Sequence, residues 1–598
     1  MTRKGQALWK LVQHAAIAVV LAGCGREEEA ASPDSEHIVL RDRVAGIDPI
    51  HVSGLASGMA AVASNIYEPL FQYHYLKRPY EVVPCLAAEM PQWSADGLKC
   101  RIRLREDARF QDDPCFSEGR GRGVTAEDVI FSWKRIADPR NASAFWAHFE
   151  HRIVGLDAYR RAVREHQPEP EVPGLHAVDE HTLEIQLTSA WPQIIHLLAH
   201  PATAVVPKDA LRTYGADFLR HPVGTGPFRL HSWQPGTGVV LKKSPTFRRE
   251  SYPAEGAPDD AASGLLADAG RRLPQVDEVH FHVIEASEPA WLLFLQGRID
   301  HLGIPTDHFS DVLDAHWQLR PAWNQKGLRV DVFPSMFLRW IGFNMADPVI
   351  AKNLPLRRAI SLAMNRQEFN DLFLGGRCGL PGSLLPPGMK EHRPELRDRW
   401  MTFDLPRAQA QRIEAEKVHG GPLPPLTLRM GGTSPLVRQI GQLITRWLAD
   451  AGLELHVDHV DERSLAATMN ERPASMFFGD GYSMTHPDPT DLFRRFASQG
   501  SDGGDNRFHY HNQRFDKWYH SLTAMPDSPE RIKLSHQMED LLLEDLPCIG
   551  FLSYNWVSVR HDWLTSFKPH AFSGPAGLIK YHRIDGQRRV PWKQQPPP

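Results

Sequence analysis

Residues 426–457 read LTLRMGGTSPLVRQIGQLITRWLADAGLELHV, and this stretch decides the fold class of the chain. The pattern predicts a strand over Leu426–Met430 and a helix over Val437–Asp450 that Gly452 terminates. A second strand is expected over Leu453–Val457. A strand, a helix and a second strand in this order are typical of an α/β layer, so we expect an α/β fold.

Further strand signals lie upstream of this stretch. Lys99–Leu104 and His181–Leu187 alternate polar and apolar residues, as half-buried strands do. Tyr252–Pro274 is rich in Pro, Gly, Ala and Asp, which indicates a long surface insertion rather than a core element. Its role is not predicted by the sequence.

Two helix starts carry capping signals. Thr125 precedes a predicted helix whose first turn contains Glu127 and Asp128. Near the other end, Asp527 and Glu530 have the spacing of a capping box that would start a last long helix.

Size and composition indicate a globular chain with no drive toward nucleic acid. The chain has 598 residues, of which 42% are hydrophobic and 23% charged. A chain of this length can bury a large core, and this balance excludes a wholly disordered, collagen-like or coiled-coil protein. The net charge of -4 gives no general attraction to polyanions, so no nucleic-acid partner is expected.

The first residues resemble an export signal. Positive residues precede a mostly apolar run over Leu11–Leu21, which is too short for a stable transmembrane helix and fits a secretory signal. The run ends in Leu21-Ala22-Gly23-Cys24, which resembles the bacterial lipobox. We therefore expect a lipoprotein signal peptide over 1–23 and a lipid on Cys24. The alternative is an ordinary signal peptide with an incidental Cys.

The stretch after Cys24 indicates a tether. Residues 24–36 are polar, small and acidic, and such a composition cannot bury enough apolar surface to fold. We expect this acidic linker to join a lipid in the bilayer to a soluble body outside the cytoplasm.

The remaining five cysteines and the histidines predict no metal or cofactor site. Cys85 and Cys100 could form a disulfide in an exported protein, or both could be buried thiols. No CxxC or HExxH spacing is present, and His509-Tyr510-His511 fits a surface loop. We therefore expect no metal ion and no cofactor.

A series of short motifs runs along nearly the whole mature chain, from about residue 38 to 585. They include Tyr67-Glu68-Pro69-Leu70, Pro84–Glu89, Thr125–Val129, Gly224-Thr225-Gly226-Pro227-Phe228, Gly297-Arg298-Ile299-Asp300, Phe343-Asn344, Pro487-Asp488-Pro489 and Glu544–Pro547. Each motif alone is weak. Their order and spacing together resemble the bacterial family 5 extracellular solute-binding proteins, which are the receptors of ABC importers for oligopeptides, dipeptides, nickel and related solutes.

The resemblance implies a two-lobed fold of the periplasmic-binding-protein type (type II, cluster C-like), with an extra domain inserted in the first lobe. Lobe I would comprise 37–66, 188–336 and 558–598, with the inserted domain at 67–187. Lobe II would be continuous over 337–557. Two hinge strands, near Leu338 and Trp556, would let the lobes close around a solute.

The resemblance also implies where a solute would bind. In peptide-binding relatives, an Asp three residues before an Asp-Pro pair binds the α-ammonium of the peptide. Here the loop is Gly481–Pro489, and Thr485 occupies that position. A buried ammonium without a counter-charge is costly, so the usual peptide clamp is in doubt. Asp480 could substitute or could cap the loop, and Asp488 is expected to stabilise the turn.

Four further residues are candidates. Tyr482 and Trp340 could form an aromatic wall of the cleft or belong to the domain core. Asn344 and Asn555 lie near the predicted hinges and could hydrogen-bond a solute or the backbone. Arg339 could meet a solute carboxylate, although we expect it to make an exposed salt bridge.

These features together predict a receptor rather than an enzyme. We expect a monomeric, lipid-anchored binding protein in the periplasm or on the outer face of the cell membrane. It would deliver a peptide or similarly sized solute to an ABC permease. The alternatives are a receptor for a non-peptide solute, such as a sugar or metal chelate, and a stand-alone ligand sensor. No catalytic nucleophile motif is present, so a hydrolase is not favoured.

Overall fold

The computed structural model describes residues 32–592, except for 53, 56, 315, 397–399, 462–464, 466–473, 499–505 and 573–577. The predicted signal peptide, Cys24 and most of the predicted acidic linker therefore lie outside the described residues. The side chain of Asp480 and those of residues 590–592 lie outside them as well. Within the described part of the chain, no helix has both the length and the apolar character needed to cross a bilayer.

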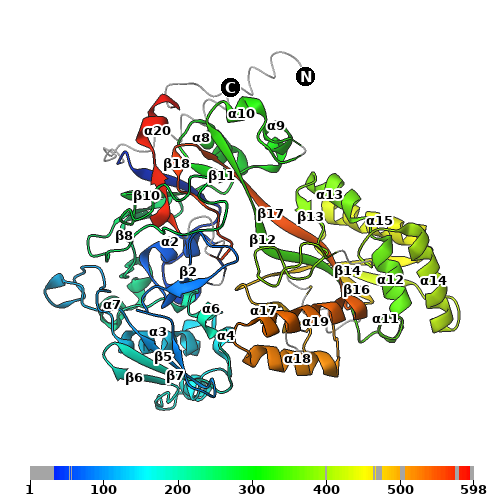
Figure 1. The fold of residues 1–598 in the computed structure, drawn as a ribbon, viewed down its shortest axis with the longest axis horizontal. Coiled ribbons are helices and arrows are strands. Elements are labelled where there is room, and N and C mark those ends of the chain that lie inside the picture. Colours follow the sequence, from blue (N-terminus) through cyan, green and yellow to red (C-terminus); the bar gives the residue numbers. More distant parts are fainter. Residues whose placement is uncertain are drawn as a thin grey trace.

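One large mixed sheet extends through two lobes (Figure 1). Among the described residues it has eleven strands, and β13 (Cys378–Gly379) pairs with β17 at its side. The others follow the order β15 (Leu455–Val460), β14 (Leu426–Gly431), β16 (Met476–Ser483), β12 (Leu328–Phe343), β17 (Cys548–His561), β11 (His301–Gly303), β1 (Ser35–Leu40), β10 (Glu278–Val283), β9 (Gly238–Lys243) and β8 (Phe228–Gln234). We call the part with β14–β16 lobe II and the part with β1 and β8–β11 lobe I.

Two long strands connect the lobes. β12 has 16 residues and β17 has 14, and they pair antiparallel from Leu328 opposite His561 to Gly342 opposite Cys548. Both contain several aromatic and β-branched residues, which suit a pleated surface. The pairing register shifts between Pro334 and Leu338, where Met336 has a φ of 54°. The two strands thus carry one continuous sheet from lobe I into lobe II.

The β-α-β unit that decides the fold class is confirmed. β14 and β15 are parallel, with Leu426 opposite Leu455, and α15 (Pro435–Asp450) joins them. The Ser434 side chain caps α15. The other longer helices of lobe II are α12 (Leu354–Ala363), α13 (Arg366–Leu374), α14 (Leu405–His419), α18 (Gln513–Ala524) and α19 (Pro529–Asp545).

A separate four-stranded sheet lies beside lobe I. Its order is β4 (Gln92–Trp93), β5 (Lys99–Arg103), β7 (Thr182–Gln186) and β6 (Leu175–Asp179), and the helices near it include α3 (Ala126–Ala137) and α5 (Leu156–Arg164). Both strands expected from alternation are present as β5 and β7. The predicted cap of α3 is also present, because Thr125 and Asp128 form a reciprocal capping box.

The predicted capping box of the last long helix is wrong. The N-cap of α19 is Ser528, whose side chain accepts from the Arg531 backbone N–H at 3.1 Å. Asp527 instead forms an ion pair with Lys390 at 2.5 Å. A Ser directly before Pro529 serves as the cap because Pro takes the first helical position.

The expectation of a surface insertion over Tyr252–Pro274 holds for most residues between the two ends of the stretch, but Asp260, Asp268 and the ends themselves are buried. Tyr252 and Leu273 are each 1% exposed and pack in a small hydrophobic cluster with Tyr75 and Tyr581. Asp260 also binds the Lys568 ammonium at 2.6 Å. The ends of the stretch are therefore part of the core of lobe I.

The two ends of the described chain are joined in lobe I. Glu36 on β1 is fully buried and lies 3.0 Å from the His582 ring nitrogen Nδ1. Arg589 donates to the Ser35 carbonyl at 2.6 Å and lies 3.4 Å from Asp300. These contacts hold α20 (Gly586–Trp592) against the first strand.

The disulfide alternative is not realised. Cys85 and Cys100 are both free and buried, as are Cys115, Cys378 and Cys548. Burial raises the pKa of Cys85 and that of Cys100 to about 12, so both are protonated thiols at neutral pH.

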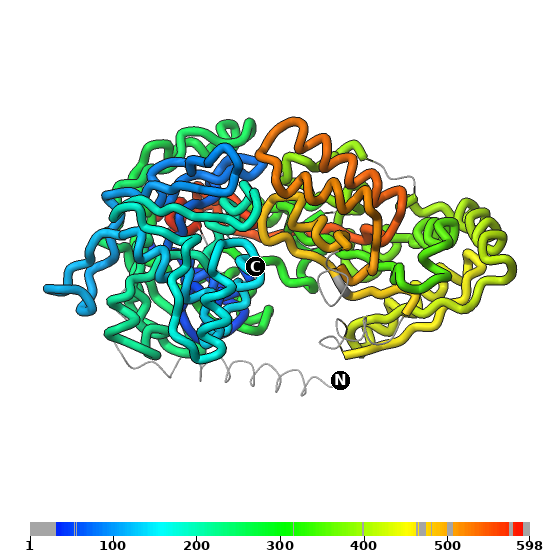
Figure 2. The backbone as a smooth tube through the Cα atoms, turned by 90° about the horizontal axis from the view of Figure 1, so that it is seen from below, coloured from blue at the N-terminus to red at the C-terminus, as the bar shows by residue number. Residues whose placement is uncertain are grey.

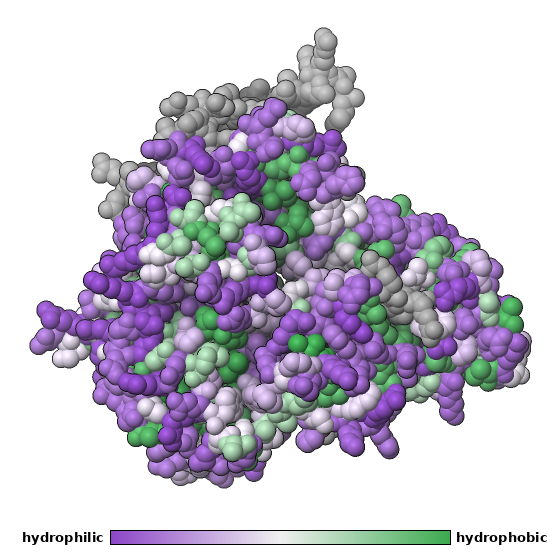
Figure 3. All heavy atoms as spheres, in the orientation of Figure 1, coloured by the Kyte–Doolittle hydropathy of each residue, from purple (hydrophilic) through white to green (hydrophobic). Residues whose placement is uncertain are grey.

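The lobes lie side by side, with the orange helices of lobe II next to lobe I (Figure 2). Hydrophilic residues predominate on the face shown in Figure 3, where hydrophobic residues form small separate patches. Small patches of this kind are normal on a soluble protein and do not indicate a large docking surface.

Candidate functional site

The lobes touch at a seam between α6 (Ile194–Leu197) of lobe I and the loop before α17 (Pro489–Phe493) of lobe II. The His196 and His486 rings stack across this seam, with centroids 5.5 Å apart and an interplanar angle of 23°. Gln193 Nε2 donates to the Met525 carbonyl at 2.8 Å. The seam therefore joins the start of α6 in lobe I to two places in lobe II, the loop before α17 and the end of α18 (Gln513–Ala524).

Asp488 anchors the lobe II side of the seam. It caps α17 by accepting from the Thr490 N–H at 2.9 Å, as the sequence predicts for a turn-stabilising residue. Arg531 binds the same carboxylate at 2.8 Å, and both side chains are 1–2% exposed. Burial disfavours the charged form of Asp488, but Arg531 outweighs this effect and keeps its pKa well below the usual range.

Thr485 lies where peptide-binding relatives are expected to carry an acidic clamp. Its backbone N–H donates to the Asp491 carboxylate at 2.7 Å. Asp491 is 4% exposed, and its pKa is lowered because His486 and Arg494 offset the effect of burial. Both buried carboxylates of this loop are thus already engaged by groups of lobe II.

A buried acid lies behind this loop. Glu391 is fully buried, and neither of its carboxylate oxygens has a hydrogen-bond partner among the described residues. Arg531 Nη1 lies 3.8 Å from one of these oxygens. Burial, with the nearby Asp488 carboxylate, raises the pKa of Glu391 to about 7. The sequence contains no signal that could have singled it out.

Lobe I contributes an aromatic group to the seam. Tyr73, Tyr80, His570 and Phe572 pack with ring centroids 4.8–6.1 Å apart. The Tyr73 hydroxyl lies 3.2 Å from His196 Nδ1. The Tyr80 ring also lies close to Gly388 of lobe II. A Cβ atom placed on Gly388 would be 3.3 Å from this ring. Sequence reasoning missed these residues because they lie between the motifs.

Trp340 and Tyr482 lie in the core of lobe II. They are 1% and 5% exposed, and their rings stack with centroids 6.4 Å apart. Phe508 contacts Trp340 edge-on at 5.3 Å, and the Arg495 guanidinium lies 4.0 Å from the Tyr482 ring centre. This placement agrees with the core alternative. A contact with solute stays a prediction for both residues.

The two candidate Asn residues are separated. Asn344 is buried, and its Oδ1 accepts from the Ala346 N–H at 3.0 Å, so it stabilises a turn. Asn555 lies on β17 opposite Pro334, near the register shift, and is partly exposed. Asp480 lies on β16, and its side chain is outside the described residues.

Arg339 does not make the expected exposed salt bridge with any described residue. Its guanidinium lies 5.7–5.8 Å from the ring centres of Phe337, Phe478 and Tyr554, and its Nε is buried. Three aromatic faces around a cation give favourable electrostatics without a carboxylate. The exposed salt bridge of Arg339 therefore stays a prediction.

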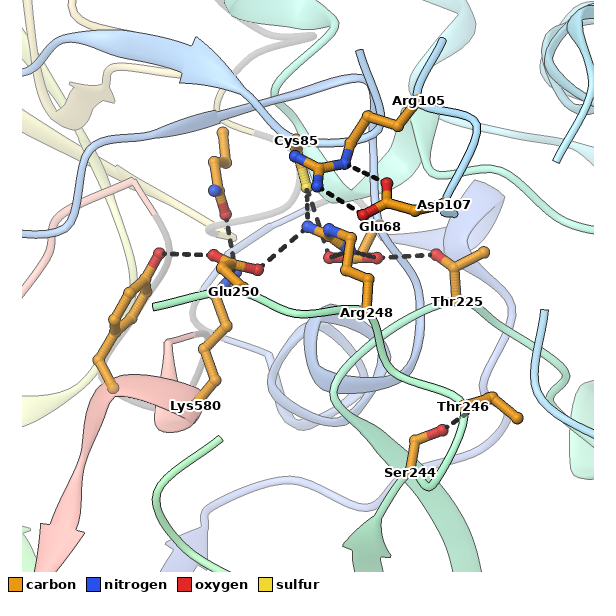
Figure 4. A network of polar contacts seen from close by, with 12 residues as sticks. Glu68, Cys85, Arg105, Asp107, Thr225, Ser244, Thr246, Arg248, Glu250 and Lys580 are labelled. Carbon is orange, nitrogen blue, oxygen red and sulfur yellow. Dashed lines mark hydrogen bonds and ion pairs between the residues drawn. The ribbon is translucent and has the colours of Figure 1, made fainter. Parts of the chain in front are cut away.

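Two of the sequence motifs meet in a buried polar network (Figure 4). Arg248 Nη1 donates to both Glu68 oxygens at 2.7 and 2.6 Å, and Thr225 Oγ1 donates to Glu68 at 3.0 Å. Lys580 and Arg248 outweigh burial and hold the pKa of Glu250 at about 2. The Tyr67–Leu70 and Gly224–Phe228 motifs therefore have in part a structural role, because the hydrogen bond between Thr225 and Glu68 joins them.

A cavity of about 60 Å³ adjoins this network and the aromatic group. Glu68, Lys580, Tyr73 and Phe572 are among its lining residues. A buried water needs roughly 10–15 Å³ of such space, so the cavity can hold a few waters but not a peptide.

A family model described as "Bacterial extracellular solute-binding proteins, family 5 Middle" matches residues 81–504. The chain belongs to this family. Its members bind solutes rather than catalyse reactions, and the expectation that the chain is not an enzyme is thereby confirmed. The sequence resemblance to family 5 is confirmed as well.

Similar proteins agree with this assignment. The glutathione-binding protein GsiB of Salmonella typhi is 24% identical over 530 residues, covering 87% of this chain and 89% of GsiB. HbpA2 from Haemophilus parasuis has a TM-score of 0.75 at 18% identity, over 92% of this chain and all of that chain. DppA from Helicobacter pylori, solved with peptide STSA, has a TM-score of 0.65 at 18% identity, covering 92% and 98%. The two-lobed α/β fold is thus the family 5 fold.

Proposed function

We propose that this family 5 protein is the extracytoplasmic receptor of an ABC importer. It captures a peptide or similarly sized solute between its lobes and delivers it to the permease in the membrane. The seam supports this proposal most directly. His196 and His486 meet across it, while β12 and β17 keep the lobes joined when side-chain contacts separate.

The domain boundaries are part of the same proposal. Lobe I comprises 37–66, 188–336 and 558–598, the inserted domain comprises 67–187, and lobe II comprises 337–557. In support, all four strands of the smaller sheet fall within 67–187. The proposed limits at 336 and 557 fall inside β12 and β17, which is where a hinge belongs.

The proposed solute is a peptide held mainly through its backbone. Thr485 supplies no charge for an α-ammonium, and Asp491 is engaged by the Thr485 N–H. Backbone recognition tolerates variation in side chains. Because GsiB is named as glutathione-binding, glutathione is included among the candidate peptides. A sugar or metal chelate is the alternative solute, and a stand-alone ligand sensor is the alternative role.

The proposed location is the periplasm or the outer face of the cell membrane. A lipid on Cys24 would hold the body through the acidic linker, and the body would act as a monomer. The apolar leader that ends at this Cys supports the proposal. A permease gene beside the gene for this chain would favour the importer over the sensor.

Thermal unfolding with a matched solute panel tests the proposal. The full chain in mild detergent is melted with free peptides, the same peptides N-acetylated, glutathione, oligosaccharides and metal chelates. A solute that binds only the folded state stabilises it by about 2.7 kcal/mol at a concentration of 100 times its Kd. We expect free and acetylated peptides to raise the melting temperature alike.

Two variants sharpen the assay. Thr485→Asp restores the charge found in the predicted clamp and should favour free over acetylated peptides, while the neutral Thr485→Asn should not. A response to sugars or chelates with none to peptides would overturn the peptide proposal. No response to any solute class would count against the receptor itself.

A further inference from the structure

One edge of β12 is open where this strand runs from lobe I toward lobe II (Figure 1). On one side, β12 pairs with β17 along almost its whole length. On the other side, β16 pairs only with residues 337–343, and Met484 then donates to the Met336 carbonyl at 3.0 Å. Among the described residues, no strand pairs with 328–335 on this side. This half of β12 is therefore the edge of the lobe I part of the sheet.

The hydrogen-bonding groups of this edge point away from β17. In an antiparallel pair, opposite residues alternate between exchanging backbone hydrogen bonds and directing these groups outward. Val557 is opposite Val332, and its carbonyl accepts from the Ile304 N–H at 3.4 Å on the far side of β17. Val332, and Val330 two residues before it, therefore direct their N–H and C=O groups to the open side of β12.

Pro334 fits the same alternation. It lies two residues after Val332, so its nitrogen also faces the open side. Within sheets, Pro is found at positions where the missing N–H faces away from a partner strand. Val330 and Val332 keep their N–H groups, so the segment 330–332 can pair with three residues of an added strand.

The side chains beside this edge are apolar and exposed. Val332 is 41% exposed and Trp556 is 49% exposed. The Phe333 ring stacks on Trp556, with centroids 6.4 Å apart and an interplanar angle of 15°. An exposed apolar edge strand is a template for pairing with another chain, and proteins usually shorten, charge or cover such an edge. This edge is thus suited to an extended peptide.

The open edge continues the line of β16 beyond the candidate clamp loop. β16 runs antiparallel to β12, and after Met484 the chain leaves this line at Thr485, whose N–H donates to Asp491. A peptide that pairs antiparallel beyond this point would begin on the Thr485 side and run toward Val330. Its N-terminus would then face the loop where peptide-binding relatives are expected to carry an acidic residue.

We propose that the edge of β12 at Val330–Val332 binds the peptide solute by strand addition. At least three extended residues pair with the outward N–H and C=O groups, and an apolar side chain of the peptide packs beside Val332. The solute is thus an extended peptide of three or more residues with apolar side chains. This inference rests on the proposed receptor function and names the surface that holds the peptide backbone.

Hydrogen exchange of the full chain in mild detergent tests the proposal, with the tripeptide Val-Ala-Val as the probe. Mass spectrometry follows exchange in fragments that cover 328–335, with and without the peptide. We expect exchange at Val330 and Val332 to slow by at least about 10-fold, because a bonded amide exchanges only when its hydrogen bond opens. Residues 337–343 are the internal control, since β16 already pairs with them.

A proline variant removes one outward donor. In Val332→Pro the N–H on the open side is lost, while the hydrogen bonds to β17 come from the neighbouring positions and remain. Calorimetry should show binding of Val-Ala-Val that is weaker by about 10-fold or more. Val332→Thr is the matched control, because it keeps the N–H and the β-branched shape and should bind like the wild type. Melting of both variants without peptide checks the fold.

Three outcomes would overturn the proposal and leave the receptor function standing. The first is binding of a peptide without slower exchange at Val330 and Val332. The second is equal binding of Val-Ala-Val by Val332→Pro and Val332→Thr. The third is no binding of Val-Ala-Val while another solute of the melting panel binds. If no solute class raises the melting temperature, the receptor proposal fails and this inference fails with it.

Discussion

Replacing Glu68 by Gln should lower the free energy of unfolding by about 3 kcal/mol. The Glu68 and Arg248 side chains are 5% and 3% exposed and lie 2.6 Å apart. Removing one charge from a buried pair costs about 3–5 kcal/mol, because the other charge stays buried without its partner. Arg248 keeps Glu250 at 3.1 Å, so the lower end of this range applies.

This loss of stability can also be expressed as a shift in melting temperature. Unfolding entropy is about 2.1 cal/mol/K per residue, so a cooperative unit of about 300 residues has about 0.6 kcal/mol/K. A loss of 3 kcal/mol then lowers the melting temperature by about 5 °C. Calorimetry and urea unfolding of the Glu68→Gln protein measure the two quantities independently.

Arg105→Gln is the matched control from the same region (Figure 4). Arg105 and Asp107 also form two hydrogen bonds, both at 2.9 Å, but the side chains are 32% and 55% exposed. An exposed pair contributes less than about 1 kcal/mol. If Glu68→Gln costs no more than Arg105→Gln, the buried pair does not stabilise lobe I and the reasoning from burial fails.

Three other predictions concern the core and pH. Trp340→Ala should lower the free energy of unfolding in urea by about 3–5 kcal/mol. Trp556→Ala should lower it by less than about 1 kcal/mol, because the Trp556 side chain is 49% exposed. Equal losses would show that Trp340 is not a core residue. Gly342→Ala would put a Cβ 2.0 Å from an aromatic ring of β16 and should lower the free energy of unfolding by at least about 1–3 kcal/mol. In Gly303→Ala the new Cβ meets nothing within 4 Å, so this variant should lose less stability. Equal melting temperatures of the two variants in calorimetry would contradict this prediction. Burial lowers the pKa of His200 to about 3. Below about pH 6.5 the unfolded chain therefore takes up a proton that the folded chain does not. The free energy of unfolding keeps the full contribution of the neutral His200 above about pH 6.5 and is lower by about 2 kcal/mol at pH 5. His200→Asn should flatten the fall in stability between pH 7 and 5, and an unchanged pH profile would refute the assignment.

Local pattern predicts the regular elements of this chain well. The strand and helix periodicities at 426–457 reappear as β14, α15 and β15 in parallel register, because a half-buried layer imposes those periods on its sequence. The exact residue at which a helix begins is predicted less reliably. Asp527 and Ser528 can both cap a helix, and only the following Pro529 and the Lys390 partner of Asp527 decide between them.

Contacts between distant segments could not be predicted. Glu68 and Arg248 are 180 residues apart, and His196 and His486 come from different lobes. Nothing in the composition around Trp340 separates a core ring from a cleft wall, because both positions favour a large aromatic residue. The candidate site was therefore located to a loop by motif resemblance, while its neighbours required the fold.

The contacts between the ends of the described chain also determine when lobe I can form during synthesis. Glu36 on the first strand needs His582, and Ser35 and Asp300 are bound by Arg589. A chain still growing on the ribosome lacks these late residues, so burying its first strand would leave the Glu36 carboxylate without its His582 partner. Lobe II, from β12 to β17, is continuous and can fold before them. The first segment to be made is thus among the last to gain all of its native contacts.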